Sequence, residues 1–413
     1  MERMLTACPA CDGTDLELTV DRPRLPAMQN YVHRSFDGAR QAKVGSLTLA
    51  VCRDCGFGFN ARFNPGLLDY DESYDNSVPS AVMGTYYETI ARHLYETYVR
   101  GNGLVVDVGC GKGTFLQTLT RLYPEVRGLG IDPSYEGPLE PTASLRFVRE
   151  FFDAGQLTER PSLVICRHVL EHIGRPVDFL RSLRNATAAY PGVPFFLEVP
   201  DLTWILRNQA FWDFCYEHCN YFSAGSLTRA VDAAGFQSLR TRAAFGDQYL
   251  WIEATNHRAA GDVSPAAIGL GSELCRTARL YDESETRLIE NSRGRLLALK
   301  REGWSTAVWG MATKGILFSY LVDPETRILD YCLDVNPNKQ NGFAPVTAHR
   351  IQPPDVLASA DGPLGKLAVV VMNENYLPEI RERCRQLGVD AELFAADMSP
   401  RPHTGSTSHR RAA

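Results

Sequence analysis

The stretch that decides the fold reads Gly103-Leu104-Val105-Val106-Asp107-Val108-Gly109-Cys110-Gly111-Lys112-Gly113-Thr114-Phe115-Leu116. A short β-branched apolar run leads into alternating glycines and then a helical pattern, which predicts a strand, a tight turn and the start of a helix. The glycines let the backbone turn sharply and let a ligand come close. Their spacing differs from the GxGxxG dinucleotide fingerprint, and Asp107 just before them suits a ligand that carries an ammonium group instead of a pyrophosphate.

A second acidic residue, Asp132, ends the next predicted strand, 127–131, where a carboxylate can accept both hydroxyls of a ribose. Together, the two acids and the glycine turn point to S-adenosylmethionine. Further strands are predicted at 145–148, 162–166 and 193–199, and a closing hairpin at 237–245 and 248–255. This order resembles the Rossmann-like sheet of class I methyltransferases, with the ligand at the carboxyl ends of the strands. The expected cofactor-binding residues are Asp107, Gly109, Gly111, Gly113, Asp132, Arg167 and His168.

Two cysteine pairs precede this domain, Cys8 with Cys11 and Cys52 with Cys55. The CxxC spacing lets both thiolates of a tight turn face one tetrahedral ion, so two such turns predict a four-thiolate zinc site. Because the protein fills all four positions, the expected role of Zn²⁺ is structural. Unligated thiols and a redox pair are the alternatives. A nucleic-acid-binding ribbon is disfavoured, because the intervening segment, including 47–51, looks like hairpin strands without a basic and aromatic face.

Size and charge limit the class of protein. A chain of 413 residues is too long for one hydrophobic core and should divide into two or three domains. The net charge of −6 and the lack of a basic block speak against nucleic acid or an anionic membrane as the main partner. The N-terminus lacks the apolar core of a signal peptide, and no later run is apolar enough to span a bilayer, so we expect a cytoplasmic enzyme.

Two polar clusters fall where this fold places its chemistry. The first, 166–173, follows the fourth strand and contains His168 and His172 one helical turn apart, where a general-base role competes with a scaffolding role. The second, 211–222, follows the fifth strand and sets Glu217 and His218 among aromatic residues, which desolvate ionisable groups and shift their pKa values. We expect the Glu-His pair to be functional, the alternative being a lid packed by aromatic side chains.

The carboxy-terminal half repeats the architecture. A charged helix is predicted over 272–300, and then strand, glycine turn, strand and acid recur at 306–315, at 329–333 before Asp334, and at 367–372. Lys314 near the turn could meet a phosphate. The alternative is a degenerate Rossmann-like domain that only packs, since only Gly310 and Gly315 remain of the glycines. The expected domains are a zinc module (1–79), a methyltransferase domain (80–258), a helical linker (259–302), an α/β domain (303–398) and a disordered tail (399–413).

Taken together, these motifs resemble the C-methyltransferases that alkylate nucleotide-linked keto-deoxysugars in antibiotic biosynthesis. The resemblance covers nearly the whole chain. It implies that His218 is the base that removes the proton beside a ketone, that Glu217 is its orienting partner, that Tyr74 hydrogen-bonds the sugar or its enolate, and that His172 assists from the opposite wall. The motifs that carry it are the four cysteines, Gly109-Cys110-Gly111, Glu217-His218 with Tyr221-Phe222, Trp309-Gly310 with Lys314-Gly315, and the run 334–340.

The chain departs from that family in two places. The family usually has a tyrosine two residues before the Glu of Glu-His, but this chain has Cys215 there and an aromatic residue one position later, Tyr216. Ala312 stands where a glycine is common, and Asn341 interrupts the usual Lys-Gln-Gly run. A substrate-facing hydroxyl is therefore missing or moved, and the substrate could differ from a typical dTDP-ketosugar.

The leading hypothesis is an S-adenosylmethionine-dependent C-methyltransferase. It would act beside a ketone of a small molecule, a nucleotide-linked ketosugar or related keto-substrate, as a monomer or homodimer. The close alternative is an O- or N-methyltransferase on the same scaffold, in which His218 deprotonates a hydroxyl or amine. A zinc-containing binding protein with an inactive methyltransferase-like domain is disfavoured by Asp107, Gly109, Gly111 and Asp132. A dehydrogenase that uses the carboxy-terminal domain is disfavoured by its poor glycine loop.

Overall fold

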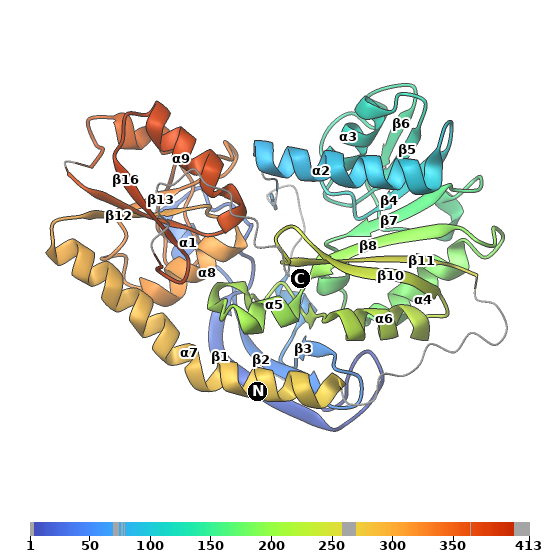
Figure 1. Cartoon of the computed structure of the whole chain (residues 1–413), viewed down its shortest axis with the longest axis horizontal. Coiled ribbons are helices and arrows are strands. Elements are labelled where there is room, and N and C mark those ends of the chain that lie inside the picture. The colour runs from blue at the N-terminus through green and yellow to red at the C-terminus, as the bar shows by residue number, and fades with distance from the viewer. Residues whose placement is uncertain are drawn as a thin grey trace, which may run out of the picture.

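The structure is a computed structural model that describes residues 4–68, 74, 75, 77, 79–257, 270–363 and 365–399. These residues form three sheets, of four, seven and five strands. Figure 1 shows the seven-stranded and five-stranded sheets as two separate α/β layers, with the four-stranded sheet below and between them. The long helix α7 (Leu270–Arg301) runs along the outside from the five-stranded to the four-stranded sheet.

The seven-stranded sheet has the order β10-β11-β8-β7-β4-β5-β6, and β11 alone among these strands runs against its neighbours. Its parallel strands are continuous apolar runs because helices cover both faces. Helices α2 and α3 pack on one face, and α4 and α6 on the other. The strands are β4 (Leu104–Val108), β5 (Arg127–Ile131), β6 (Leu145–Val148), β7 (Leu163–Arg167), β8 (Pro194–Pro200), β10 (Gln237–Ala244) and β11 (Tyr249–Thr255). The helices are α2 (Ala81–Leu94), α3 (Thr114–Leu122), α4 (Pro176–Ala186), α5 (Leu202–Arg207) and α6 (Ala224–Ala233).

The five-stranded sheet is all parallel, in the order β14-β13-β12-β15-β16. Its first turn needs glycine because a Cβ at Gly315 would lie 2.1 Å from the carbonyl oxygen of Gly310. The strands are β12 (Ser305–Trp309), β13 (Tyr331–Leu333), β14 (Ile351–Gln352), β15 (Leu367–Val371) and β16 (Ala391–Ala395), and the helices are α8 (Thr313–Val322) and α9 (Leu377–Gln386). This arrangement confirms the second Rossmann-like α/β domain.

The amino-terminal sheet is antiparallel and draws its last strand from far along the chain. Its order is β1-β2-β3-β9, with β1 (Leu16–Pro26), β2 (Val44–Cys52) and β3 (Gly58–Asn60) joined by β9 (Asn220–Tyr221), and a short helix α1 (Phe36–Arg40) lies between β1 and β2. The sequence did not predict that the segment after Glu217-His218 would complete this sheet. The boundaries 1–79 and 80–258 stay predictions.

The α/β class, the parallel sheet with its closing hairpin, and the long helix expected over 272–300 are confirmed. The short strands β14 and β16 were not predicted, because an isolated run of a few apolar residues carries little periodicity. The expected tail lies outside the described residues except for Ser399, as does 259–269 of the expected linker. Among the described helices, none is both long and apolar enough to cross a membrane.

Candidate active site

The glycine turn after β4 forms an open cradle at the carboxyl edge of the seven-stranded sheet. Gly109, Gly111 and Gly113 have φ angles of 75°, 54° and 77°, a region that L side chains rarely adopt. A Cβ at Gly109 would lie 2.2 Å from Cγ2 of Val169, whereas the space beside Gly111 is open for at least 4 Å. A ligand can therefore approach the backbone here, as the sequence predicted for S-adenosylmethionine.

The two acids of the cradle have different surroundings. Asp107 is buried at the end of β4, and this burial, opposed by Arg167, raises the pKa of Asp107 to about 7. Asp132 accepts hydrogen bonds from the backbone of Gly111 at 2.8 Å and of Ser134 at 2.7 Å. Asp132 thus holds the glycine turn in place beside the edge where a ribose is expected. A cationic ligand next to Asp107 would favour its ionised form.

A charge cluster lies at the end of β7 and beside it in β8. Arg167 pairs with Glu198 at 2.7 Å, and His168 lies between Glu198 at 3.3 Å and Glu171 at 3.4 Å. Burial alone would lower the pKa of His168, but the two carboxylates outweigh it and raise that pKa to about 9. Arg167 also lies over the Tyr87 ring at 4.7 Å, and its Nη2 atom is buried without a hydrogen-bond partner. The cluster reaches the cradle through Arg167, which acts on Asp107, and reaches His172 and His218 through Glu171.

The candidate bases His172 and His218 lie side by side. Their ring centroids are 4.9 Å apart and the rings meet edge to face, so His172 lies beside His218 and not on an opposite wall. Nδ1 of His172 lies 2.9 Å from the carbonyl oxygen of Glu217, and because a carbonyl can only accept, Nδ1 carries the hydrogen. The lone pair of a neutral His172 is therefore on Nε2. Burial, reinforced by His172, lowers the pKa of His218 to about 3 and keeps this imidazole neutral.

The carboxylate of Glu217 points into the amino-terminal module. It accepts hydrogen bonds from the backbone amides of Gln29 and Asn30 and, at 2.9 Å, from the hydroxyl of Tyr74. Tyr74 belongs to the segment 70–77, of which the structure describes Tyr74, Asp75 and Ser77. The structure thus brings Tyr74, Glu217, His218 and His172 into one site. The role of Glu217 as the orienting partner of His218 stays a prediction.

The carboxy-terminal domain closes the site from the other side. Lys339 is buried and donates to Oδ1 of Asn30 at 2.8 Å, while Lys314 bridges to Asp213 at 3.0 Å and to Gln248 at 2.8 Å. The motif 334–340 that carries part of the resemblance therefore lies against the amino-terminal module. Lys314, for which the sequence suggested a phosphate contact, connects the two α/β domains.

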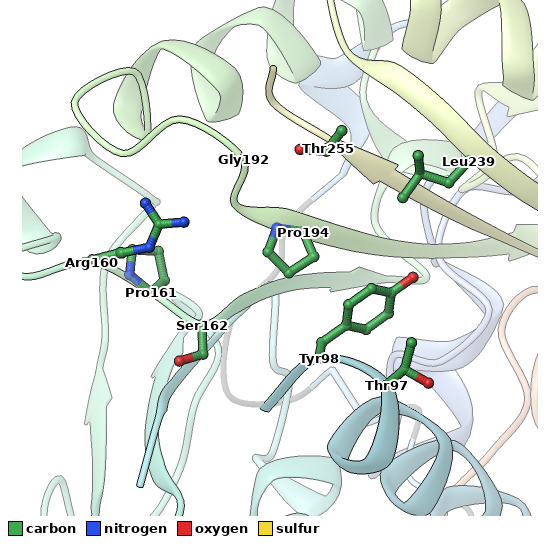
Figure 2. Close-up of a pocket in the computed structure, with 9 residues that line it drawn as sticks. All are labelled: Thr97, Tyr98, Arg160, Pro161, Ser162, Gly192, Pro194, Leu239 and Thr255. Carbon is green, nitrogen blue, oxygen red and sulfur yellow. The ribbon is translucent and has the colours of Figure 1, made fainter. Parts of the chain in front are cut away.

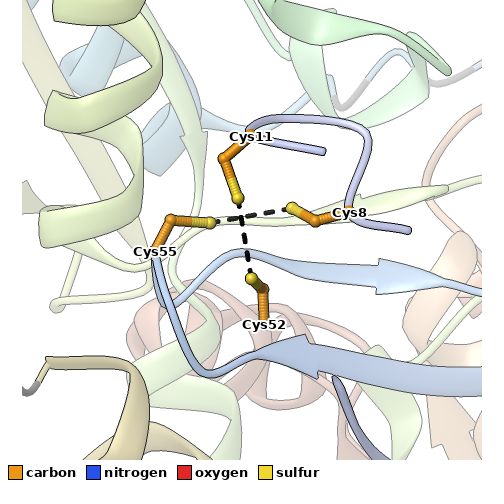
Figure 3. A group of neighbouring side chains, drawn as sticks. All are labelled: Cys8, Cys11, Cys52 and Cys55. Atoms are coloured by element: carbon orange, nitrogen blue, oxygen red, sulfur yellow. Dashed lines mark hydrogen bonds between the residues drawn. The ribbon is translucent and has the colours of Figure 1, made fainter. Parts of the chain in front are cut away.

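The four cysteines of the N-terminal module converge on one point (Figure 3). The sulfurs of Cys8 and Cys55, and those of Cys11 and Cys52, are 3.6 Å apart, and all four lie within 4.8 Å of one another. Zn–S bonds of about 2.3 Å in a tetrahedron place the sulfurs about 3.8 Å apart. The donor set and its spacing therefore fit a four-thiolate zinc ion.

A separate cavity of about 410 Å³ lies at the opposite edge of the seven-stranded sheet (Figure 2). Tyr98, Ser162, Pro194 and Thr255 line it, near the amino ends of β7 and β8. In open α/β sheets ligands bind beyond the carboxyl ends of the strands. None of the predicted site residues lines this cavity, so we assign it no part in the chemistry.

Sequence reasoning missed three residues of the site, Glu198, Glu171 and Asn220. Glu198 is fully buried, and its signal was a single acid inside the apolar strand β8. Glu171 was given no role although it lies between two histidines in the sequence. Asn220 donates to the carbonyls of Leu170 and Ile173, a contact that no local pattern reveals. The shifted aromatic residue Tyr216 is buried and its hydroxyl bonds to the backbone of Asn64, so it takes a structural place.

Comparisons with known families match both α/β domains. Residues 86–241 match a family described as a methyltransferase domain, and residues 272–390 match one described as a C-methyltransferase C-terminal domain. The chain is 27% identical over 396 residues to the C-methyltransferase NovU of Streptomyces niveus, covering 92% of each protein.

Two solved methyltransferase structures each match less than half of the chain. A putative methyltransferase in complex with the Haloferax volcanii Trm112 activator has a TM-score of 0.35 and 16% identity, over 44% of this chain and 93% of that one. Magnesium protoporphyrin IX methyltransferase of Synechocystis PCC 6803 has a TM-score of 0.33 and 17% identity, over 45% of this chain and 90% of that one.

Proposed function

Because the chain is an S-adenosylmethionine-dependent methyltransferase with a C-methyltransferase C-terminal domain, we propose that it methylates a carbon beside a ketone. The acceptor we propose is a nucleotide-linked deoxysugar or a related keto-substrate. One observation carries the proposal. The neutral imidazole of His218 lies beside that of His172, at the same carboxyl edge of the seven-stranded sheet as the glycine cradle. A neutral imidazole has a lone pair that can accept the proton of the carbon.

The proposed reaction begins with proton transfer to the protein. His218 removes the proton from the carbon next to the ketone, and the electrons of that C–H bond move into an enolate. The hydroxyl of Tyr74 donates its one hydrogen to Glu217 in the ligand-free site, and it would turn this hydrogen to the enolate oxygen, which makes the negative charge there less costly. When bound, S-adenosylmethionine supplies an electrophilic methyl group. His172, fixed by the Glu217 carbonyl, would orient the ring of His218 beside it.

The proposed cofactor residues are those of the cradle and its neighbours. Asp107 would face the cationic end of the cofactor and Asp132 the ribose, with the backbone of Gly109 and Gly111 between them. Arg167 and His168 would line the same pocket from the end of β7. The open space beside Gly111 supports this placement.

We propose that Cys8, Cys11, Cys52 and Cys55 bind one structural Zn²⁺. The ion would fix the start of the amino-terminal module and the end of β2 relative to each other. That module supplies the amides of Gln29 and Asn30 that hold Glu217, so the zinc site would support the active site without touching the acceptor.

The proposal is tested by the position of the transferred methyl group. Purified enzyme is incubated with ¹³C-methyl S-adenosylmethionine and a panel of nucleotide-linked ketosugars, and the products are analysed by mass spectrometry and NMR. A new carbon–carbon bond beside the ketone supports the proposal. A methyl ether or methylamine as the product would show an O- or N-methyltransferase, and no product across the panel would rule out this acceptor class.

A further inference from the structure

We propose that Glu171 is the positioning residue whose carboxylate balances the positive charge that forms on the His172–His218 pair during proton removal. The inference rests on the proposed function and deepens it, because nothing in the sequence motifs gives Glu171 a role.

The geometry places this carboxylate next to both imidazoles. One oxygen of Glu171 and one ring nitrogen each of His172 and His218 lie within 4.8 Å of one another. Glu171 is 1% exposed, and its Oε2 atom is buried without a hydrogen-bond partner. Burying a carboxylate oxygen without a donor is unfavourable in free energy, and a cationic donor nearby would offset that penalty. The donor that the reaction provides is the newly protonated imidazole.

Glu217 is poorly placed for the same task although it precedes His218 in sequence. One of its oxygens faces the amides of Gln29 and Asn30, and the other accepts from Tyr74. Its acceptor sites are thus directed at the N-terminal module and the enolate side of the site. Glu171, by contrast, lies near both imidazoles and has a carboxylate oxygen without a hydrogen-bond partner.

The charges around the imidazole pair act in opposite directions. Glu171 favours protonation of His218. Burial opposes it most, and His172, His168 and Lys314 oppose it as well. On the far side, His168 bonds both Glu171 and Glu198, and Glu198 pairs with Arg167. Without the charge of Glu171, burial and the neighbouring cations would oppose protonation of His218, and no other carboxylate is among the main influences on it. The protonated base should then become less stable.

The test substitutes Glu171→Gln, which keeps the shape of the side chain and removes its charge. We expect kcat to fall roughly 100-fold. The acid limb of the profile of kcat against pH reports the base with cofactor and acceptor bound. It should move by about one unit or more toward lower pH, because the base holds its proton less tightly. Binding of S-adenosylmethionine, measured by calorimetry, should change less than threefold. An unchanged kcat and acid limb in a folded Glu171→Gln variant would overturn the inference.

The matched control is Glu253→Gln. Glu253 is also a buried carboxylate beside an imidazole, with Oε1 2.8 Å from Nε2 of His93, but this pair lies away from the His172–His218 site. The control should lose stability without shifting the acid limb. A control that shifts the limb as much as Glu171→Gln would show a general effect of lost charge and contradict the inference.

Two further measurements separate the possible failures. If Glu171→Gln does not fold, Glu171→Asp is used, which keeps the charge and withdraws it by one methylene. We expect this variant to have a lower kcat and the wild-type acid limb. Wild-type values for both would contradict the inference. Wild-type enzyme that forms no carbon–carbon bond with any ketosugar refutes the proposed function itself. Wild-type activity with an unaffected Glu171→Gln variant refutes only the role of Glu171.

Discussion

Asp107 is the residue whose ionisation should control cofactor binding. In the ligand-free protein burial raises its pKa to about 7, so the carboxyl group is largely protonated below that pH. A cationic ligand prefers the carboxylate, and binding must then release the proton. We therefore expect the Kd for S-adenosylmethionine to rise about tenfold for each pH unit below about 7 and to be flat above it.

Calorimetry between pH 5.5 and 8.5, with thermal melting to confirm the fold at each pH, checks this prediction. The Asp107→Asn variant should bind more weakly and show no such dependence on pH. A wild-type Kd that is constant across this range would mean that Asp107 does not face the cationic part of the ligand.

Single residues also show how far the sequence could lead. The glycines, Asp107 and the pair Glu217-His218 could be found because short-range spacing sets their place in a turn or next to each other. The direction of the Glu217 carboxylate could not, because it depends on amides of Gln29 and Asn30 that are nearly 190 residues away along the chain, with sequence separations of 188 and 187. Contacts of that kind leave no local pattern.

At the level of elements, the loop that carries His172 is fastened to β9. Nδ2 of Asn220 donates to the carbonyl of Leu170 at 2.8 Å and to that of Ile173 at 2.6 Å, and Asn220 is buried. Replacement by alanine removes the side-chain donor of both carbonyls, and the Leu170 carbonyl then keeps only the amide of Ile173, at 3.3 Å. The Asn220→Ala variant should lose about 1–3 kcal/mol of unfolding free energy and also lose kcat, because the loop carrying His172 becomes less fixed.

Denaturant unfolding measures the loss, with Asn208→Ala as the control. Asn208 makes one exposed hydrogen bond to the carbonyl of Trp204, and its loss should cost less than about 0.5 kcal/mol. Equal effects from the two substitutions would argue against a clamp at Asn220.

The amino-terminal sheet is the element that the zinc site should stabilise. Cys52 ends β2, and β3 of the same sheet pairs with β9 directly after the Glu217-His218 segment. The purified protein should contain one zinc ion per chain, and Cys52→Ser should lower both the melting temperature and kcat. Elemental analysis and thermal melting test this, with Cys384→Ser, a buried thiol on α9 of the other domain, as control. Zinc-free protein with full activity would contradict it.

Across the whole molecule, polar contacts add to the apolar packing between the two α/β domains, in which the rings of Phe211 and Phe318 stack. Lys314 of α8 pairs with Asp213 and Gln248 of the methyltransferase half, and Gln248 exchanges amide hydrogen bonds with Asn373. Burial raises the pKa of Asp213, and Lys314 opposes that effect. The relative position of the domains should therefore depend on this lysine.

The Lys314→Met variant should lose roughly 2–4 kcal/mol of stability, because Asp213 is left buried without its cation. Its KM for the acceptor should rise more than its Kd for S-adenosylmethionine, because the cradle lies wholly within one domain. Adding Asp213→Asn should restore part of the stability. A double variant that is less stable than Lys314→Met would show that the pair does not act as a unit.

The arrangement of domains was only partly accessible from sequence. Periodicity and the recurring strand, glycine turn and acid predicted two Rossmann-like layers, and both are present. The entry of β9 into the amino-terminal sheet was hidden, because Asn220-Tyr221 is a two-residue strand within an aromatic segment that also fits a lid. Lys339, buried against Asn30, was likewise visible only as a motif.

The most direct measurement is deuterium uptake from heavy water into a ketosugar, followed by NMR without any methyl donor and with S-adenosylhomocysteine filling the cradle. Our account predicts that the native enzyme exchanges the hydrogen on the carbon beside the ketone, and that His218→Asn slows this exchange roughly 10²–10⁴-fold while still binding the nucleoside. Exchange at the native rate in His218→Asn would contradict the assignment of the base. No exchange in native enzyme that nevertheless methylates the sugar would contradict carbon deprotonation itself.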